Sequence, residues 1–196
     1  MIRLLIGFLL GIALTLLVAF CYVRYGFVDP RADAEVGSLE SKIAMPALDA
    51  AVDRRASDAK NPVQPTDENL TAGMNIYQQN CAECHGDIQC RQNPFGASFY
   101  PRAPQFLEDA PDMPENQNFY IIQHGVRLSG MPAWGPSLDD QKIWKLTTFL
   151  SHMGKLPPSV SAAWKTVASA PETGPPTDSG SKIQSKEKKS MELPTH

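Results

Sequence analysis

The 196-residue sequence lacks an excess of either charge, because 18 Lys and Arg residues stand against 21 Asp and Glu residues, a formal net charge of −3. Its central part, about 66–158, holds six basic and ten acidic residues. A strongly basic surface for an acidic partner is therefore not indicated. Nothing in the sequence indicates nucleic-acid binding.

Runs of alternating β-branched residues are also missing, so no strand is predicted. Apolar spacing predicts one helix over about 67–81 and a second over about 114–124. A third helix is expected to begin at Ser137, with Asp140 placed as in a capping box, and to stop at the prolines 157–158. The predicted fold class is all-α.

Cysteine is scarce, with four in the chain, and two of them form the motif Cys81-Ala82-Glu83-Cys84-His85. C-x-x-C-H is typical of covalent haem c attachment. Two thiols three positions apart on one helical turn can add to the two haem vinyl groups. The imidazole of His85 would then bind the haem iron. A single motif predicts one covalent haem c.

Two other interpretations of this motif are weaker. A thioredoxin-like dithiol also uses C-x-x-C, but it requires a βαβ setting, whereas the surrounding sequence predicts helices and proline-rich loops. A zinc site needs two further ligands at close spacing, and only Cys90 and distant histidines remain.

The second axial ligand of the iron is predicted to be Met131, which lies 46 residues after His85 in the segment Ser-Gly-Met-Pro-Ala-Trp-Gly. A thioether is a soft ligand that raises the reduction potential of a haem iron. Three rival residues are Met113, His124 and Met74. Met113 precedes the start of a helix, His124 lies in the last turn of one, and Met74 has the spacing of a core residue.

Residues 61–158 resemble the class I monohaem c-type cytochromes of bacteria, through NPVQPTDENLTAGMNIYQQNCAECHG, YPRAPQFL, GVRLSGMPAWG and IWKLTTFL in this order. The resemblance implies a small helical domain around one haem, whose first and last helices cross near one haem edge. It also implies a proline carbonyl that accepts a hydrogen bond from His85. Pro104 is the candidate for this position, with Pro101 and Pro94 as alternatives.

The N-terminal region contains a run of 20 residues without charge, Leu4–Val23. This length spans a bilayer core as a helix. A transmembrane anchor is predicted over 1–25, since a cleaved signal peptide, the alternative, has a shorter apolar stretch and a small-residue cleavage site. Covalent haem attachment in bacteria takes place outside the cytoplasmic membrane. We therefore expect a single-pass protein of that membrane, with its haem domain on the periplasmic side.

The remaining boundaries follow from composition. Residues 26–65 are expected to form a periplasmic linker with a short helix starting at Pro46, which acts as a spacer, packs on the domain or packs on a partner. Residues 66–158 are predicted to be the cytochrome c domain. Residues 159–196, rich in Pro, Ser, Thr, Lys and Glu, are predicted to be a disordered tail.

The resemblance implies a one-electron carrier rather than an enzyme, acting within or beside a respiratory or periplasmic oxidoreductase complex. Its expected partners are periplasmic or membrane redox proteins, as donor and acceptor. A haem-based ligand sensor or peroxidase-like protein with a displaceable sixth ligand is the alternative.

Overall fold

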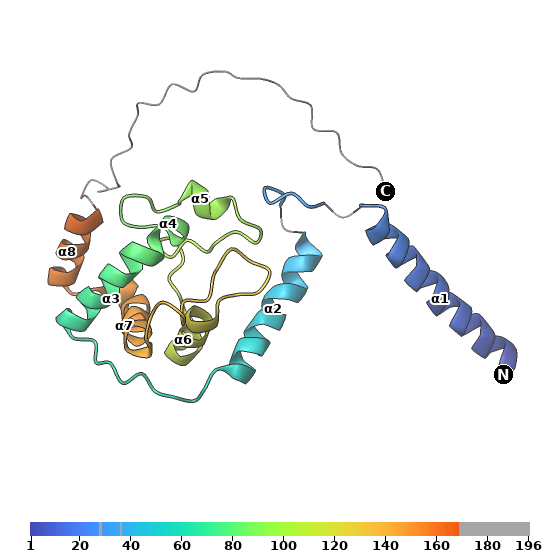
Figure 1. The fold of residues 1–196 in the computed structure, drawn as a ribbon, viewed down its shortest axis with the longest axis horizontal. Helices are drawn as coiled ribbons and strands as arrows, with labels where there is room; N and C mark the ends of the chain where they lie inside the picture. The colour runs from blue at the N-terminus through green and yellow to red at the C-terminus, as the bar shows by residue number, and fades with distance from the viewer. Residues whose placement is uncertain (28, 36, 169–196) are drawn as a thin grey trace, which may run out of the picture.

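The computed structural model describes residues 1–27, 29–35 and 37–168 (Figure 1). These residues form helices and loops, and no strand occurs among them, which confirms the predicted all-α fold class. The elements in chain order are α1 (Ile2–Arg24), α2 (Ser38–Arg55), α3 (Asp67–Asn80), α4 (Ala82–His85), α5 (Pro94–Ala97), α6 (Glu115–His124), α7 (Asp140–His152), the 3-10 turn η1 (Met153–Lys155) and α8 (Pro158–Ala168).

The centre of the domain is the crossing of α3 and α7, visible in Figure 1. Gly73 of α3 lies at this crossing, where an added Cβ would approach the carbonyl oxygen of Lys145 far inside contact distance and lie 2.8 Å from Phe149 Cβ. Glycine allows the two backbones to come this close because it has no side chain. The ring of Tyr77, one turn further along α3, lies 5.5 Å from that of Phe149.

The helix starts are set by polar side chains. Thr66 is the N-cap of α3, since its hydroxyl accepts a hydrogen bond from Asn69 N at 3.3 Å. α7 begins later than predicted, because Asp139 rather than Ser137 is its N-cap. Asp139 Oδ1 accepts a hydrogen bond from Lys142 N at 2.8 Å, which is the main cause of its lowered pKa. A carboxylate there also complements the helix dipole.

The helix predicted over 114–124 is α6, and it starts one residue later than expected. Pro114 has ψ 147°, so it stands before the helix as its N-cap rather than within the first turn. Gly125 ends the helix at φ +68°, as expected for a glycine after the last turn.

The predicted disordered tail was wrong for its first ten residues. α8 covers Pro158–Ala168 and packs on α3, so the helical domain does not end at 158 (Figure 1). Val160 and Trp164 are buried, because they lie four positions apart on one face of the helix. Pro158, expected only to stop a helix, begins one. The rest of the predicted tail lies outside the described residues.

The spacer between anchor and domain packs on the domain. α2 starts eight residues before the expected start at Pro46 and runs through this proline, which costs one backbone hydrogen bond. Val52 of α2 is buried, and α2 contacts α6. Three hydrogen bonds join α2 and the residues just after it to the domain. Two reach α6: Gln117 Nε2 to Asp53 Oδ1 at 3.1 Å, and Asn116 Nδ2 to Ser57 O at 2.9 Å. The third reaches the loop after α5: Tyr100 Oη to Glu40 Oε2 at 2.5 Å.

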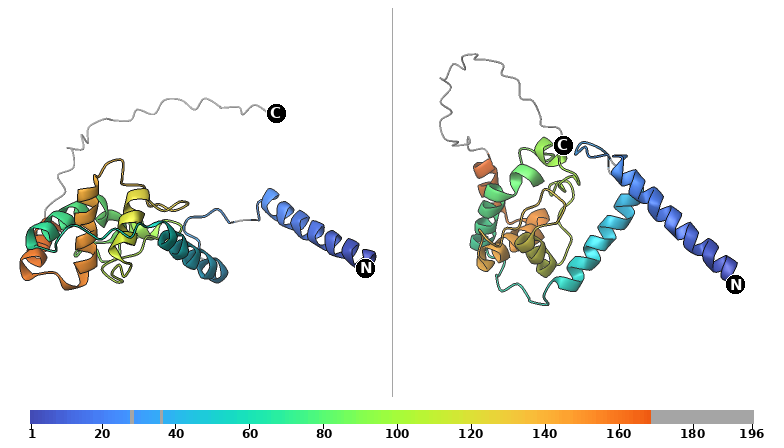
Figure 2. Two further views of the ribbon diagram at one scale, coloured as in Figure 1. Left: turned by 90° about the horizontal axis from the view of Figure 1, so that it is seen from below. Right: turned by 45° about the vertical axis from the view of Figure 1, so that its right-hand side comes forward.

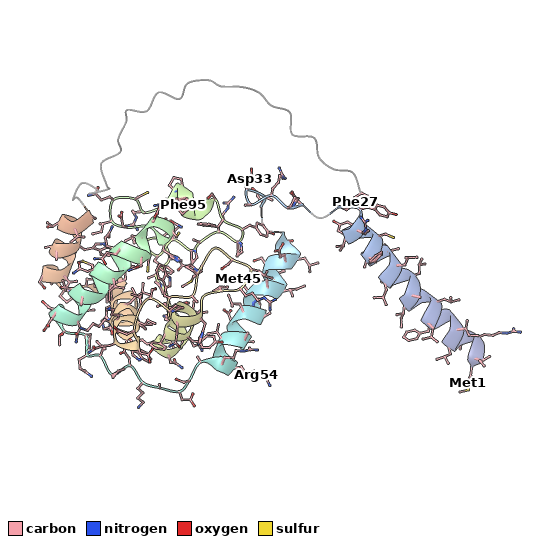
Figure 3. All side chains as sticks on the ribbon, viewed as in Figure 1. Met1, Phe27, Asp33, Met45, Arg54 and Phe95 are labelled. Carbon is pink, nitrogen blue, oxygen red and sulfur yellow. The ribbon has the colours of Figure 1, made fainter. Side chains whose placement is uncertain are left out.

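α1 contacts no other element, and none of its residues is buried. Figure 2 shows it extending away from the domain, and Figure 3 shows its side chains, between the labelled Met1 and Phe27, projecting on all sides. By length and apolar composition it is able to cross a membrane, the one helix of this kind among the described residues.

Candidate haem-attachment site

The residues of the C-x-x-C-H motif lie on one turn. Cys81 ends α3 and caps α4, and its carbonyl oxygen accepts hydrogen bonds from Cys84 N at 3.1 Å and His85 N at 2.9 Å. All four cysteines of the chain are free, so no disulfide competes for the two sulfurs. The geometry presents two thiols and one imidazole from a single turn, as thioether attachment and axial ligation of one haem require.

Burial keeps both motif thiols protonated. It raises the pKa of Cys81 to about 12, with a smaller contribution from Cys84. The pKa of Cys84 is also raised, by burial and by the negative charge of Glu83. A thioredoxin-like dithiol depends on a lowered thiol pKa, so these values argue against that interpretation. Among the described residues no group of three His, Cys, Asp or Glu side chains is arranged for a metal ion, which removes support for a zinc site.

His85 is 8% exposed, and its ring is held on two sides. Nδ1 lies 2.8 Å from the carbonyl oxygen of Pro104, and the ring stacks on Phe106 with 4.2 Å between centroids and 6° between planes. A carbonyl oxygen only accepts, so Nδ1 carries the proton and the lone pair lies on Nε2. Burial lowers the pKa of His85, the contact with Pro104 acts in the opposite direction, and the ring is neutral.

Among the three candidate prolines, the structure brings Pro104 to His85. Pro94 instead begins α5, and Pro101 is exposed in the following loop. A second contact joins the segment of Pro104 to the motif turn, because Phe106 N donates to His85 O at 3.0 Å. The donor set therefore fits a haem iron: one neutral imidazole with a free Nε2, oriented by a carbonyl.

Met131 lies in the loop between α6 and α7, half-buried against the same apolar cluster that Cys81 and Phe106 contact. Val126 N donates to Met131 O at 3.2 Å, which closes the loop. Gly125 permits this closure, since a Cβ there would lie 2.6 Å from Pro132 C. Gly130 lies against the ring of Phe99 in the same way.

The rival ligands are placed differently. Met74 is fully buried in α3 as part of the core, as its spacing predicts. His124 is exposed in the last turn of α6, beside the ring of Tyr120. Met113 accepts a hydrogen bond at its carbonyl oxygen from Asn118 Nδ2 at 2.9 Å, so its backbone serves the start of α6.

Several residues that support the site were missed at the sequence level. Phe106 stacks on His85, Gln105 binds the carbonyl oxygen of Cys84, and Tyr77 binds that of Gly86. Their partners are 9 to 21 positions away, and no fixed spacing marks such contacts. The segment Pro-Gln-Phe-Leu is the one sequence signal for these residues, and a contact with His85 was predicted only for its proline, Pro104.

Three comparisons bear on this domain. Residues 68–150 match the family model described as cytochrome C oxidase, cbb3-type, subunit III. The cbb3-type cytochrome c oxidase subunit FixPc of Rhizobium leguminosarum bv. viciae is 33% identical over 91 residues, which is 46% of this chain and 30% of that relative. The chain thus matches less than a third of the relative's length.

A chain of the Kuenenia stuttgartiensis reducing HAO-like protein complex Kustc0457/Kustc0458 is similar with a TM-score of 0.40 and 21% identity, over 59% of this chain and 60% of that one. This low likeness supports no functional statement. The residues matched by the family model include the C-x-x-C-H motif, the Met131 loop and most of α3 and α7. Residues 68–150 are therefore a c-type cytochrome domain, related to subunit III of cbb3-type oxidases and built to bind haem c covalently.

Proposed function

We propose that this chain is a membrane-anchored one-electron carrier with a single covalently bound haem c. The observation that carries the proposal is the geometry of one turn, in which Cys81, Cys84 and His85 are presented together and His85 Nδ1 is held by Pro104 O at 2.8 Å. Haem c, when bound, supplies an iron that takes up and releases one electron.

The protein residues have separate roles in this proposal. Cys81 and Cys84 form the thioether bonds, and His85 binds the iron through Nε2. Because Pro104 and Phe106 hold the imidazole ring in a fixed orientation, little reorganisation of this ligand would be needed when the charge of the iron changes. The buried position of His85 excludes water from this side.

Met131 is proposed as the second axial ligand. Its loop is closed by the Val126 N–Met131 O bond and backed by Phe99. Its side chain packs on the cluster that also receives Cys81. A His/Met pair fills both axial positions, so we propose electron transfer rather than sensing or peroxidase chemistry, which require a displaceable sixth ligand.

The setting of the carrier is proposed from its ends and its relatives. α1 would anchor the chain in the bacterial cytoplasmic membrane, with the haem domain on the periplasmic side where haem is attached. The relative FixPc is named as an oxidase subunit. By this likeness the chain would act within or beside a respiratory oxidase complex, with membrane or periplasmic redox proteins as donor and acceptor.

Mass and colour of the denatured full-length protein test the proposal. The protein is expressed in a bacterium able to mature c-type cytochromes and purified in mild detergent. We expect one haem per chain, retained after denaturation, and its loss in the variant Cys81→Ser/Cys84→Ser. Cys90→Ser is the matched control, and it should retain the haem. A wild-type chain without covalent haem, or with a haem that binds carbon monoxide rapidly in the absence of denaturant, would reject the electron-carrier proposal.

A further inference from the structure

Gln105 lies between the two residues that hold His85, and its side chain makes three hydrogen bonds. Nε2 donates to Cys84 O at 2.9 Å and to Ala103 O at 2.9 Å. Oε1 accepts from Asn93 N at 2.8 Å. Both polar atoms of this half-buried amide therefore bind backbone groups. One of these groups, Ala103 O, lies in the same segment as Gln105, and the other two belong to two different segments of the chain.

The first of these segments is the haem-attachment turn itself. Cys84 O is enclosed from two sides, since Gly96 of α5 packs so tightly there that an added Cβ would lie 2.8 Å from Cys84 C and 3.0 Å from Gln105 Nε2. Gln105 is the side chain that supplies a donor to this enclosed carbonyl oxygen. Leaving such a buried acceptor unpaired would be costly.

The second segment is the start of α5. Asn93 caps this helix, because its Oδ1 accepts a hydrogen bond from Phe95 N at 2.9 Å. Ala103 N donates to Gly96 O at 3.0 Å, so residues 103–105 are fastened to α5 at both ends. Gln105 therefore joins the loop after the motif to residues 103–105, the segment that contains Pro104.

The consequence concerns the carbonyl oxygen of Pro104. Its neighbour Gln105 is bound to Cys84 O, and Phe106 N is bound to His85 O. The peptide unit of Pro104 is therefore located relative to the motif turn by contacts made by the following two residues. Without them, the loop is free to move Pro104 O away from Nδ1.

We infer that Gln105 is a positioning residue for the axial histidine, which it serves by holding Pro104 O against His85 Nδ1 through Cys84 O and Asn93 N. This inference rests on the proposed haem function and extends it. The side-chain hydrogen bonds of Gln105 go to the backbone of Cys84, Ala103 and Asn93, so it would act on His85 through these segments. A firm Nδ1–H···O bond makes Nε2 a more basic ligand, which favours ferric iron and lowers the reduction potential.

The test uses the full-length holoprotein in detergent and compares the wild type with Gln105→Ala and Gln105→Leu. Gln105→Leu keeps a similar side-chain volume and adds no charge, but it removes the donor to Cys84 O and the acceptor for Asn93 N. Gln117→Ala is the matched control, because Gln117 also donates through Nε2, to Asp53 on α2, far along the chain from the motif. Haem per chain, thermal unfolding and reduction potential against a fixed mediator are measured for each protein.

We expect all four proteins to carry haem. Both Gln105 variants should have a higher potential than the wild type, so that the equilibrium constant for electron exchange with the mediator moves toward the reduced protein by roughly threefold or more. Gln117→Ala should keep the wild-type potential. Unchanged potentials in both Gln105 variants would overturn the inference.

Loss of haem from both Gln105 variants would also overturn it, because Gln105 would then be required for folding and attachment rather than for positioning. If only one Gln105 variant loses haem, the potential of the other decides by the same criterion. Absence of haem from the wild type is a separate outcome, which rejects the proposed function itself.

Discussion

Tyr77 donates its phenolic hydrogen to the carbonyl oxygen of Gly86 at 2.5 Å, which ties the middle of α3 to the residue that follows His85. Tyr77 is fully buried, and burial raises its pKa far above the usual range, so it remains a donor at all ordinary pH values. The same ring contacts Phe149 and Trp164. One residue thus links the helix crossing, α8 and the motif turn.

Replacing Tyr77 by Phe should lower the free energy of unfolding of the holoprotein by about 1–3 kcal/mol, because Gly86 O is left buried without a donor. Denaturant unfolding followed by the haem absorbance measures this. Tyr120→Phe is the control, since Tyr120 is only half-buried, and it should change stability little. Equal stabilities of Tyr77→Phe and wild type would contradict the importance of the bond.

Gly73→Ala should destabilise the domain although alanine favours a helix. Helix propensity alone would contribute about 1 kcal/mol in favour of alanine. The added Cβ, however, meets backbone of Lys145, which cannot move aside without separating α3 from α7. Overpacking of this kind costs about 1–3 kcal/mol, so the net change should be a loss. The midpoint of thermal unfolding checks it.

Gly154→Ala is the comparison for Gly73→Ala, because an added Cβ at Gly154 meets nothing within 4 Å. It should leave the unfolding midpoint unchanged or raise it. If both variants, or neither, had a lower unfolding midpoint than the wild type, the close approach of α3 and α7 would not be the reason why residue 73 must be glycine.

Trp164→Ala tests whether α8 belongs to the domain. Trp164 is 3% exposed, its Nε1 donates to Gln78 Oε1 at 3.0 Å, and its ring stands edge-on to that of Phe149. Truncation of a buried tryptophan costs about 3–5 kcal/mol. We expect a loss of this size in denaturant unfolding, while Val167→Ala, at a largely exposed position of the same helix, should have little effect.

If Met131 is the second axial ligand, as proposed, Met131→Ala should abolish the sulfur-to-iron charge-transfer band of the oxidised protein and lower the reduction potential, because a thioether ligand favours ferrous iron. Absorption spectroscopy and a redox titration measure the two effects. Met113→Leu, at the start of α6, should retain the band. Persistence of the band in Met131→Ala would identify another residue as the ligand.

The contact between α2 and the domain should depend on pH through Tyr100. Its hydrogen bond to Glu40 is the main reason why its pKa is raised above 10.0. A raised pKa in the folded state means that the contact contributes its full stability below about pH 10 and loses it as the pH rises through the raised value. Glu40→Gln should bring this pKa back towards its usual value.

Difference absorbance titration at the phenolate band, against Tyr100→Phe to isolate this residue, measures the pKa of Tyr100. The pKa should be higher in the wild type than in Glu40→Gln. Identical titrations would mean that α2 does not rest on the loop in solution.

Much of the architecture was predictable from local sequence signals. The spacing of apolar residues located α3, α6 and α7, and the uncharged run located α1. Gly125 marked the end of α6, because glycine readily adopts the positive φ found after a last helical turn. The predicted start of α7 was wrong because Asp139, two residues after Ser137, is the N-cap that the helix uses. The helix α8 was missed because it was taken as part of the polar, proline-containing segment that follows it.

The sequence by itself determined which residues we propose for haem attachment, because the spacing of Cys81, Cys84 and His85 lets one helical turn present all three. Only the tertiary structure decided what orients that turn. The contacts of Pro104, Gln105 and Phe106 with it join segments about 20 residues apart. Such pairings depend on how loops close and helices cross, which no local spacing records.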